Sequence, residues 1–324
     1  MDWTETPHPP DLCPAPMQQH GAYGRACTRI GSRVIWMTAG APALPAAFAQ
    51  VLIRRWPGFG DFALVARGPV FTAPVSRAEA GRITLDLVQE LRRRCRGVMV
   101  TPEPGGEDDP LTGSGLLPMV TGGAQARLML DGTAAERMAR QNGKWRNRLR
   151  RAEEAGLTVE QGPLPEDPSH WLLLAEEAQA AARGYRRLPR SFTYAWRAAN
   201  GARATRVFTA TLRGERVAAM LFLLHGDTAS YHLGWSNSGG RDSHAHNLLL
   251  WRASDWLARR GHVWLDLGTL DTETTPGLAR FKLGSGAVPV RMGATWMEAP
   301  GTALVARLFR AGPRRLPAGL PSPG

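Results

Sequence analysis

The sequence predicts an α/β protein with mixed sheets, built from two units in tandem. Short apolar runs alternate with amphipathic helical segments through residues 21–131, which is typical of an α/β unit. A second alternating segment begins near Thr133 and continues to about residue 300. Within it, three apolar runs joined by Gly-containing turns, in ATRVFTATLRGERVAAMLFLLHGDTASYHLGWSN, predict an antiparallel meander.

Length and composition exclude several classes of protein. A chain of 324 residues with 43% hydrophobic residues can bury one large core or two ordinary ones, and it is not mainly disordered. No run approaches about eighteen uncharged apolar residues, and the N-terminus has acids and prolines where a signal peptide needs a basic start. We therefore expect a cytoplasmic protein without a transmembrane segment. Three widely spaced cysteines, Cys13, Cys27 and Cys95, fit neither a disulfide framework nor a zinc site, so we expect free thiols.

The formal net charge of +12 comes from 38 arginines and only two lysines against 28 acidic residues. Much of it lies in short basic runs, and such a balance favours anionic partners such as RNA, a nucleotide-linked substrate or a phosphorylated cofactor. The alternative interpretation is a solvated, arginine-rich surface. The basic runs are 92–96, 144–151, 183–190 and 307–315.

The first unit is expected over residues 21–131, after a Pro-rich leader at 1–20 that we expect to be extended or poorly ordered. We predict helices over 45–56 and 77–94, because apolar residues recur there at helical spacing. In the first helix, Ala46, Phe48, Val51 and Leu52 would form the apolar side. Strands are predicted at RVIWMTAG, FALVARGPVF, GVMVTPEP and ARLMLD.

The second unit is expected over residues 132–300, followed by a basic Gly/Pro-rich tail at 301–324. Thr133 and Glu136 form a T-x-x-E pattern that predicts a capping box at the start of a helix continuing to Gly156. Another helix is predicted over 169–183, ending at Gly184, and a last strand at VPVRMGATWMEA.

The helix predicted around KWRNRLRRAEE has two distinct faces. Lys144, Arg148 and Arg151 are spaced i, i+4 and i+7 and share one face, while the apolar residues Trp145, Leu149 and Ala152 share the neighbouring face. One face should pack on the protein and the other should remain cationic. A merely solvated charged face is the alternative.

The segment from 245 to 286 is the best-defined part of the sequence. Ala245, Leu249, Ala253 and Trp256 fall three or four residues apart on one helix face, and Gly261 follows where a left-handed residue ends a helix. The run HVWLDLG then predicts a buried strand that carries a single carboxylate, Asp266, and a short turn follows that ends on Phe281 and Lys282.

These segments resemble a known family. The meander ending in LGWSN, with the helix, strand and turn after it, resembles the acyltransferase fold of the GNAT superfamily. KWRNRLRRAEEAGLTVE, HNLLLWRASDWLARRG, DLGTLD and GLARFKLGSGA together resemble the FemAB-type aminoacyltransferases and their BioF2-like relatives. The first half is similar to the degenerate N-terminal GNAT unit of those proteins. The resemblance covers roughly residues 25–298 and implies two tandem GNAT-like units.

The resemblance implies an enzyme that transfers an aminoacyl or acyl group to an amine. The donor would be a co-substrate, aminoacyl-tRNA or acyl-CoA, with no tightly bound cofactor, and the acceptor a peptidoglycan precursor, a peptide or a small amine. An amine that attacks an ester or thioester forms a tetrahedral oxyanion, so the site needs a cation where this charge develops and a way to remove the ammonium proton.

Lys282 is the candidate for that cation, because Phe281-Lys282 resembles the Phe-Lys motif of the family, in which the lysine has this role. Phe281 would then wall the end of the carrier, and the alternative is a core phenylalanine followed by an ordinary surface lysine. Asp266 could orient the lysine or accept a proton, and it could equally cap a nearby backbone turn.

The donor-binding candidates are less well matched. Gly239, Gly240 and Arg241 stand where GNAT enzymes have a Q/R-x-x-G-x-G/A loop for pyrophosphate, but the pattern differs and Asp242 opposes an anion, which favours aminoacyl-tRNA over coenzyme A. By resemblance, the basic face of Lys144, Arg148 and Arg151 would meet a phosphate or carboxylate of donor or acceptor, and Arg67 is a further candidate for acceptor binding.

The sequence leaves two other features to interpret. His244 and His246 lie two residues apart on a helix and face different sides, so no metal site is expected. A tandem-GNAT scaffold without catalytic activity, binding RNA or a partner through its basic faces, remains the alternative function.

Overall fold

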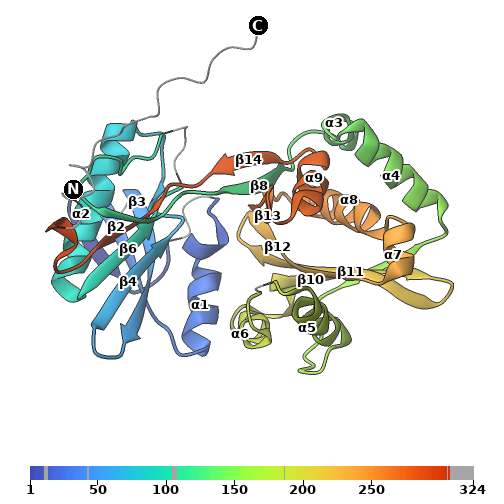
Figure 1. Ribbon diagram of the computed structural model, residues 1–324, viewed down its shortest axis with the longest axis horizontal. Helices are drawn as coiled ribbons and strands as arrows, with labels where there is room; N and C mark the ends of the chain where they lie inside the picture. Colours follow the sequence, from blue (N-terminus) through green and yellow to red (C-terminus); the bar gives the residue numbers. More distant parts are fainter. Residues whose placement is uncertain (11–13, 42–43, 104–107, 186, 305, 307–324) are drawn as a thin grey trace, which may run out of the picture.

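The computed structural model describes residues 1–306 except 11–13, 42–43, 104–107, 186 and 305. Cys13 and the predicted tail beyond residue 306 therefore lie outside the described residues. Two sheets lie side by side, each with helices packed on its faces (Figure 1).

The first sheet is built mainly from the N-terminal part of the chain. Its strand order is β1-β2-β3-β4-β6-β15-β7, and β5 pairs with β3. Its strands are β1 (Trp3–Thr6), β2 (Arg33–Ala41), β3 (Leu44–Trp56), β4 (Gly60–Ala66), β5 (Val70–Phe71), β6 (Gly97–Thr101), β7 (Leu117–Val120) and β15 (Thr295–Glu298).

The second sheet has the order β14-β8-β13-β12-β11-β10-β9. Its strands β10 to β12 form the predicted antiparallel meander. The strands are β8 (Ala124–Met129), β9 (Thr158–Gly162), β10 (Thr205–Leu212), β11 (Glu215–His225), β12 (Thr228–Ser236), β13 (Trp264–Leu270) and β14 (Val288–Arg291).

The two sheets repeat one arrangement. Within the described residues each holds a single parallel pair, β4 with β6 and β12 with β13, among antiparallel neighbours. A helix precedes the second strand of each pair, namely α2 (Arg77–Arg94) and α8 (Ala245–Ala258). Parallel neighbours need such a crossover. The predicted α/β class, with mixed sheets in two tandem units, is confirmed.

The units exchange strands. The predicted last strand of the first half is β8, which belongs to the second sheet, and the single strand predicted at VPVRMGATWMEA is two strands, β14 in the second sheet and β15 in the first. β8 and β14 pair with each other and run together between the two lobes (Figure 1). A division of the chain between residues 131 and 132 therefore does not follow the membership of the sheets.

Several predicted helix boundaries are confirmed. The capping box of Thr133 and Glu136 is present, and Gly184 is left-handed after its helix. The remaining helices are α1 (Gly21–Arg29), α3 (Ala134–Ala139), α4 (Gly143–Glu154), α5 (Trp171–Arg183), α6 (Arg190–Asn200), α7 (Ser238–Asp242) and α9 (Pro276–Gly284), with short 3-10 turns at Met17–Gln19 and Ala202–Ala204.

The prediction of a helix over residues 45–56 is wrong, because this segment is strand β3. Helices or strands cover both of its faces, so all seven residues from Ala47 to Ile53 are buried. The alternation of buried and exposed residues that marks a half-exposed strand is therefore missing. Val51 packs in the core of the first unit, whereas Leu52 packs against α1 and α6.

Two further expectations are corrected. The leader is not poorly ordered throughout, since β1 adds an edge strand and the indole of buried Trp3 donates to the Ile83 carbonyl at 3.0 Å. The helix expected from Thr133 to Gly156 is interrupted, because the Asn142 N–H bonds the Gly284 carbonyl at 2.9 Å while the Asn142 side chain caps α4.

Helices α1 and α6 were not predicted, and they join the two units. Ala22 and Ala26 of α1 pack against Phe192 and Trp196 of α6 in one shared cluster. Both helices are nevertheless amphipathic, and the sequence carries a signal for them: Phe192, Ala195 and Trp196 fall three or four residues apart on the buried face of α6. None of the helices that the structure describes is both long and apolar enough to cross a membrane.

Candidate active site

The second sheet opens directly after Asp266. Parallel pairing of β12 with β13 ends there, and both strands become irregular: β12 shifts register against β11, and β13 shifts against β8 between Asp266 and Thr269. Gly268, with φ +79°, permits the turn in β13. The paired residues before the opening are Thr228 with Trp264, Ala229 with Leu265 and Ser230 with Asp266.

Lys282 lies at this opening. It is carried by α9, which begins at Pro276 in a position that suits proline, and its side chain is 6% exposed. Its Nζ donates to the Thr269 carbonyl at 2.7 Å. Burial lowers the pKa of Lys282 to about 8, although the negative charge of Asp266 acts in the opposite direction. An ammonium with few local partners therefore lies where the two strands part.

Phe281 fixes the position of α9. Its ring is half-buried against the core of the second unit, with its centroid 6.2 Å from the ring of Trp145 and 6.5 Å from that of His246. Its carbonyl accepts a hydrogen bond from the Trp145 indole at 3.1 Å. Phe281 thus links α9 to α4, which is the packing role expected of a core phenylalanine.

Asp266 is buried and forms an ion pair with the first unit. Its Oδ2 lies 2.6 Å from Nη1 of Arg67, which is 199 residues earlier in the chain, and the bond goes to this guanidinium rather than to a backbone turn. Its Oδ1 is buried without a hydrogen-bond partner among the described residues. The free oxygen can accept a hydrogen bond from a ligand.

Arg67 is the centre of a chain of charges at the junction of the units. Its Nη2 lies 2.6 Å from Oε2 of Glu103, and Glu103 also pairs with Arg127, whose guanidinium lies over Trp264 at 4.5 Å. Burial alone would lower the pKa of Arg67, but Asp266 and Glu103 outweigh it and raise the pKa. The sequence did not point to Glu103 or Arg127, because each is one acid or base in an unremarkable segment.

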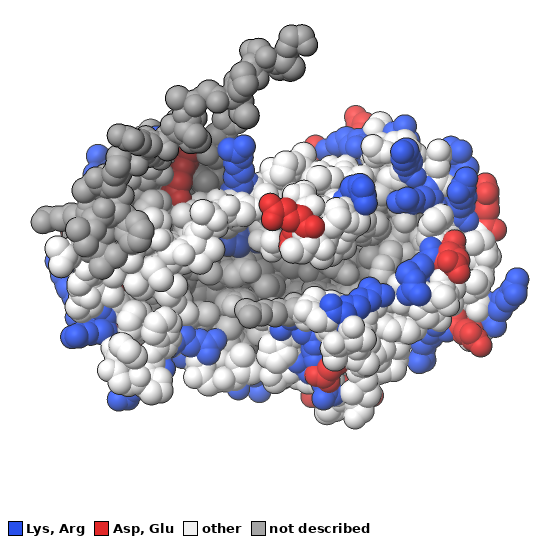
Figure 2. All heavy atoms as spheres, in the orientation of Figure 1, with Lys and Arg blue, Asp and Glu red and all other residues white. Residues whose placement is uncertain are grey.

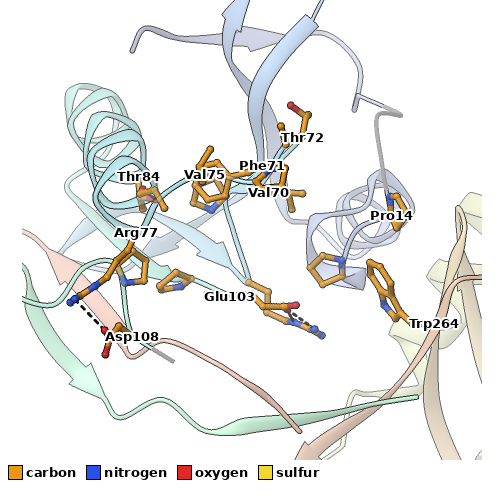
Figure 3. A pocket seen from close by; sticks show the side chains of 18 residues that line it. Pro14, Val70, Phe71, Thr72, Val75, Arg77, Thr84, Glu103, Asp108 and Trp264 are labelled. Carbon is orange, nitrogen blue, oxygen red and sulfur yellow. Dashed lines mark hydrogen bonds and ion pairs between the residues drawn. The ribbon is translucent and has the colours of Figure 1, made fainter. Parts of the chain in front are cut away.

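Arg67 and Glu103 also line a cavity of about 710 Å³. Such a volume suits a small ligand. In Figure 3 the pair of Arg77 with Asp108 lies at one end of the cavity, Trp264 at the other and Glu103 between them. The walls are mostly apolar and include Pro14, Pro69, Val70, Phe71, Val75 and Pro110.

The basic face of α4 is exposed as predicted. Lys144, Arg148 and Arg151 are exposed, whereas the neighbouring apolar face is buried. Figure 2 shows Lys and Arg side chains gathered over the region of α3 and α4. Burial lowers the pKa of His244, and the positive charges of Arg148 and Arg151 lower it further, so both guanidiniums lie near the N-terminus of α8.

The presence of glycine in α7 has a structural explanation. The Asn237 side chain accepts from the Gly240 N–H at 3.0 Å, and a Cβ on Gly240 would lie 2.2 Å from the Val217 carbonyl oxygen. Arg241 donates to the Ser236 carbonyl at 3.1 Å. The structure brings Gly239, Gly240 and Arg241 together beside the start of α8, with the Gly240 amide already bonded.

The histidines of the second sheet are internal. Burial lowers the pKa of His232 to about 4, so the ring is neutral at pH 7, and it hydrogen-bonds Thr193 at 2.7 Å. Among the residues that the structure describes, no three His, Cys, Asp or Glu side chains are grouped as metal ligands would be.

Comparison with known proteins shows which folds this chain resembles. Residues 139–283 match the family model described as Acetyltransferase (GNAT) domain. The crystal structure of FemX is 14% identical, with 90% of this chain and 96% of that chain covered and a TM-score of 0.71. A tandem GNAT protein from the clavulanic acid biosynthesis pathway is 13% identical, with 91% of each chain covered and a TM-score of 0.52.

A third similar structure is L-PGS from Bacillus licheniformis, at 14% identity, with 90% of this chain and 92% of that chain covered and a TM-score of 0.51. No curated protein matches the chain in sequence. At these identities the likeness to the solved structures shows the fold.

The buried pair of Arg67 and Asp266 predicts a large loss of stability when one partner is removed. We expect Arg67→Met to lower the free energy of unfolding by about 3–5 kcal/mol, because buried Asp266 is left without its cation and Glu103 keeps only Arg127. The double variant Arg67→Met with Asp266→Asn should lose less unfolding free energy than the sum of the losses in the two single variants. Denaturant unfolding measures both.

The matched control is Arg77→Met, which removes an exposed ion pair with Asp108 at 3.5 Å. It should cost less than about 1 kcal/mol. Equal losses for Arg67→Met and Arg77→Met would contradict the structural role of Arg67.

The close approach of α7 to β11 predicts different results for two adjacent glycines. Gly240→Ala should lower the free energy of unfolding by about 1–3 kcal/mol, because its Cβ would collide with the Val217 backbone. Gly239→Ala, whose Cβ would make an ordinary 3.4 Å contact with Val217, should be neutral or slightly stabilising. If the two variants unfold alike, this packing argument is wrong.

Proposed function

The chain contains a GNAT acetyltransferase domain within a FemAB-type tandem-GNAT fold, and from this premise we propose that it is an N-acyltransferase. It would move an aminoacyl or acyl group from a phosphate-bearing carrier to an amine. The observation that carries the proposal is the buried ammonium of Lys282 at the opening between β12 and β13.

The proposed step needs a cation at one atom. The amine nitrogen attacks the carbonyl carbon of the donor, a C–N bond forms, and the C=O electron pair moves to the oxygen. Lys282 stabilises this oxyanion until the pair returns and expels the carrier as its alcohol or thiol. Because Lys282 lies in a water-poor site, its charge acts more strongly than it would at the surface.

The donor phosphates are proposed to lie against Lys144, Arg148 and Arg151 near the start of α8. This helix begins at His244 without a side-chain cap, and helix N-termini attract anions. Gly239 and Arg241 extend this surface. The Gly240 amide, which a pyrophosphate would need, is bonded to Asn237, and this supports aminoacyl-tRNA over acyl-CoA as the donor.

The acceptor is proposed to enter through the cavity lined by Arg67 and Glu103. Asp266 lies between that cavity and Lys282, since its Oδ2 pairs with Arg67 and its charge acts on the lysine. The free Oδ1 is suited to hold the acceptor ammonium and to take its proton. The acceptors to compare are a peptidoglycan precursor, a peptide and a small amine.

The burial of Lys282 predicts an unusual titration. With [13Cε]lysine the chain gives only two lysine signals, from Lys144 and Lys282, so an NMR titration can follow Lys282 directly. We expect a pKa of about 8, and a rate of transfer that falls as the pH rises through this value, because only the protonated lysine stabilises the oxyanion. Asp266→Asn should lower the pKa of Lys282 in the NMR titration, since the carboxylate favours the ammonium. A Lys282 signal that titrates as free lysine does, near pH 10.4, would contradict the site.

The function itself predicts a loss of turnover without a loss of folding. Lys282→Met should reduce kcat about 10²- to 10³-fold, the usual cost of removing an oxyanion donor. The pKa of Lys282 is lower in the folded than in the unfolded chain, so the ammonium opposes folding below about pH 8. The variant should therefore be at least as stable as the parent at pH 7.

Arg280→Met is the matched control, because Arg280 is an exposed cation on the same helix. Transfer to an amine is measured with aminoacyl-tRNA and with acetyl-CoA as separate donors. Unchanged turnover in Lys282→Met, or no transfer from either donor, would overturn the proposal and leave the binding scaffold as the better interpretation.

A further inference from the structure

The hairpin between β3 and β4 presents exposed aromatic rings at one edge of the first sheet, at the lower left of Figure 1. Its turn is closed by a hydrogen bond from the Phe59 N–H to the Trp56 carbonyl at 2.9 Å. Pro57 and Gly58, whose φ is +79°, are the residue types that fix such a tight turn. Phe59 is 69% exposed and Trp56 is 41% exposed. A short, fixed turn therefore holds two aromatic side chains in water.

Packing within the first unit does not account for these rings. Trp56 stacks on Phe62 with the ring centroids 4.4 Å apart, which covers one face of the indole and leaves the other. Neither Trp56 nor Phe59 belongs to the core that the described residues of this unit form. Single exposed apolar side chains are common on protein surfaces, whereas a group of them marks a site of interaction.

Strand pairing brings further segments to the same edge. β2 begins where Arg33 pairs with Ile53, and β6 begins where Gly97 pairs with Phe62. The last pairs of β3 with β4 follow directly beyond these positions, so the hairpin leaves the sheet there. The turn before β2 adds Ile30, which is 37% exposed. The segments that meet at this place, called the hairpin edge below, are 29–33, 54–60 and 96–97.

The hairpin edge is strongly basic. Its three segments contain no Asp or Glu, and Asp61, which follows the hairpin turn, is only partly exposed. Figure 2 shows basic side chains around this corner of the molecule and no acidic ones there. The exposed arginines of the hairpin edge are Arg29, Arg33, Arg54, Arg55 and Arg96.

These arginines are not neutralised by the protein. Among the residues that the structure describes, none of the five forms an ion pair, whereas the neighbouring Arg94 pairs with Glu5 and Glu90. Five unpaired guanidiniums therefore surround an apolar tip. A surface of this kind is complementary to a partner that is both anionic and apolar.

A bilayer with anionic lipids has both properties. Aromatic side chains are favoured at the boundary between headgroups and acyl chains, and arginines near a negatively charged leaflet are attracted to it. A soluble polyanion would use the arginines but would leave Ile30 in water. A second copy of this chain would bring two sets of like charges together. The combination of charge and apolar tip therefore favours a membrane.

We propose that the hairpin edge docks the protein on an anionic membrane, with Phe59 and Trp56 inserted among the headgroups. The surrounding guanidiniums donate hydrogen bonds to lipid phosphates, for which their planar fork is suited. The hairpin edge belongs to the first sheet, whereas Lys282 lies at the opening beside β13 of the second. Docking is therefore independent of acyl transfer.

The test is co-sedimentation of the full chain with vesicles of phosphatidylglycerol and phosphatidylcholine in equal parts, and with vesicles of phosphatidylcholine alone. We expect binding to the anionic vesicles to be tighter by about 10-fold or more. Arg54→Gln with Arg55→Gln should weaken this binding about 10-fold or more, because each arginine near an anionic surface contributes about a factor of five. Phe59→Ser should weaken it about fivefold, because an inserted ring is lost.

Two matched controls separate docking from net charge and from general apolarity. Arg148→Gln with Arg151→Gln removes the same charge from the exposed face of α4. Leu44→Ser changes a side chain that is 78% exposed at the opposite end of β3. At physiological salt, where charges further apart than about 8 Å are screened, each control should change the affinity less than about threefold.

Each other result would overturn the proposal. Equal losses in the two double-arginine variants would mean that binding follows net charge alone. Unchanged binding by Phe59→Ser would exclude insertion, and equal affinity for both kinds of vesicle would exclude a role for the arginines. No binding of the parent protein to anionic vesicles would exclude the membrane altogether. Unfolding curves verify that the variants fold, and Arg55→Gln alone, with an expected loss of about fivefold, serves if the double variant does not.

Discussion

The ion pair between Arg67 and Asp266 is the contact on which the arrangement of the site depends. It joins a turn of the first unit to the last residue of β13 that pairs with β12, and both side chains are almost fully buried, at 8% and 3% exposure. Removing two charges from water is costly, and the pair is tolerated because Glu103 and Arg127 extend it into a chain of alternating charge. The α1–α6 cluster and the ribbon of β8 and β14 hold the same junction by packing and by pairing.

The same pair sets the electrostatics of Lys282. Burial lowers the pKa of the lysine, whereas the charge of Asp266, which is paired with Arg67, raises it. A cation of the first unit thus holds the carboxylate that acts on a lysine in the second. An ammonium whose pKa is about 8 is protonated at neutral pH yet poorly solvated, which is the condition in which it gains most from a negative oxygen nearby.

The sequence predicted the features that depend on local patterns, such as the capping box at Thr133, the two faces of α4, the meander, and α8 with β13. The prediction for β3 failed because tertiary contacts override the pattern: β3 is buried on both faces, so its apolar residues show no alternation. For α1 and α6 the amphipathic pattern is present in the sequence, and what it does not show is that the two helices pack on each other across the units. Lys282 and Asp266 could be found because a motif and a lone carboxylate mark them, whereas Glu103 acquires its role only when distant segments meet at Arg67.

The basic residues around Trp256, which lies on α8, have different physical explanations. Arg259 and Arg260 follow the end of the helix, where cations are favoured by the helix dipole, and Arg259 pairs with Asp255 one turn earlier. Arg206 lies on β10, where its Nη1 donates to Oε1 of Gln161 at 3.0 Å and its guanidinium lies over the same indole as Arg260. Arg260 in turn donates to the Trp256 carbonyl at 3.4 Å. Contacts within the second unit, cation–π contact with one indole and hydrogen bonds to protein oxygens, thus account for both arginines.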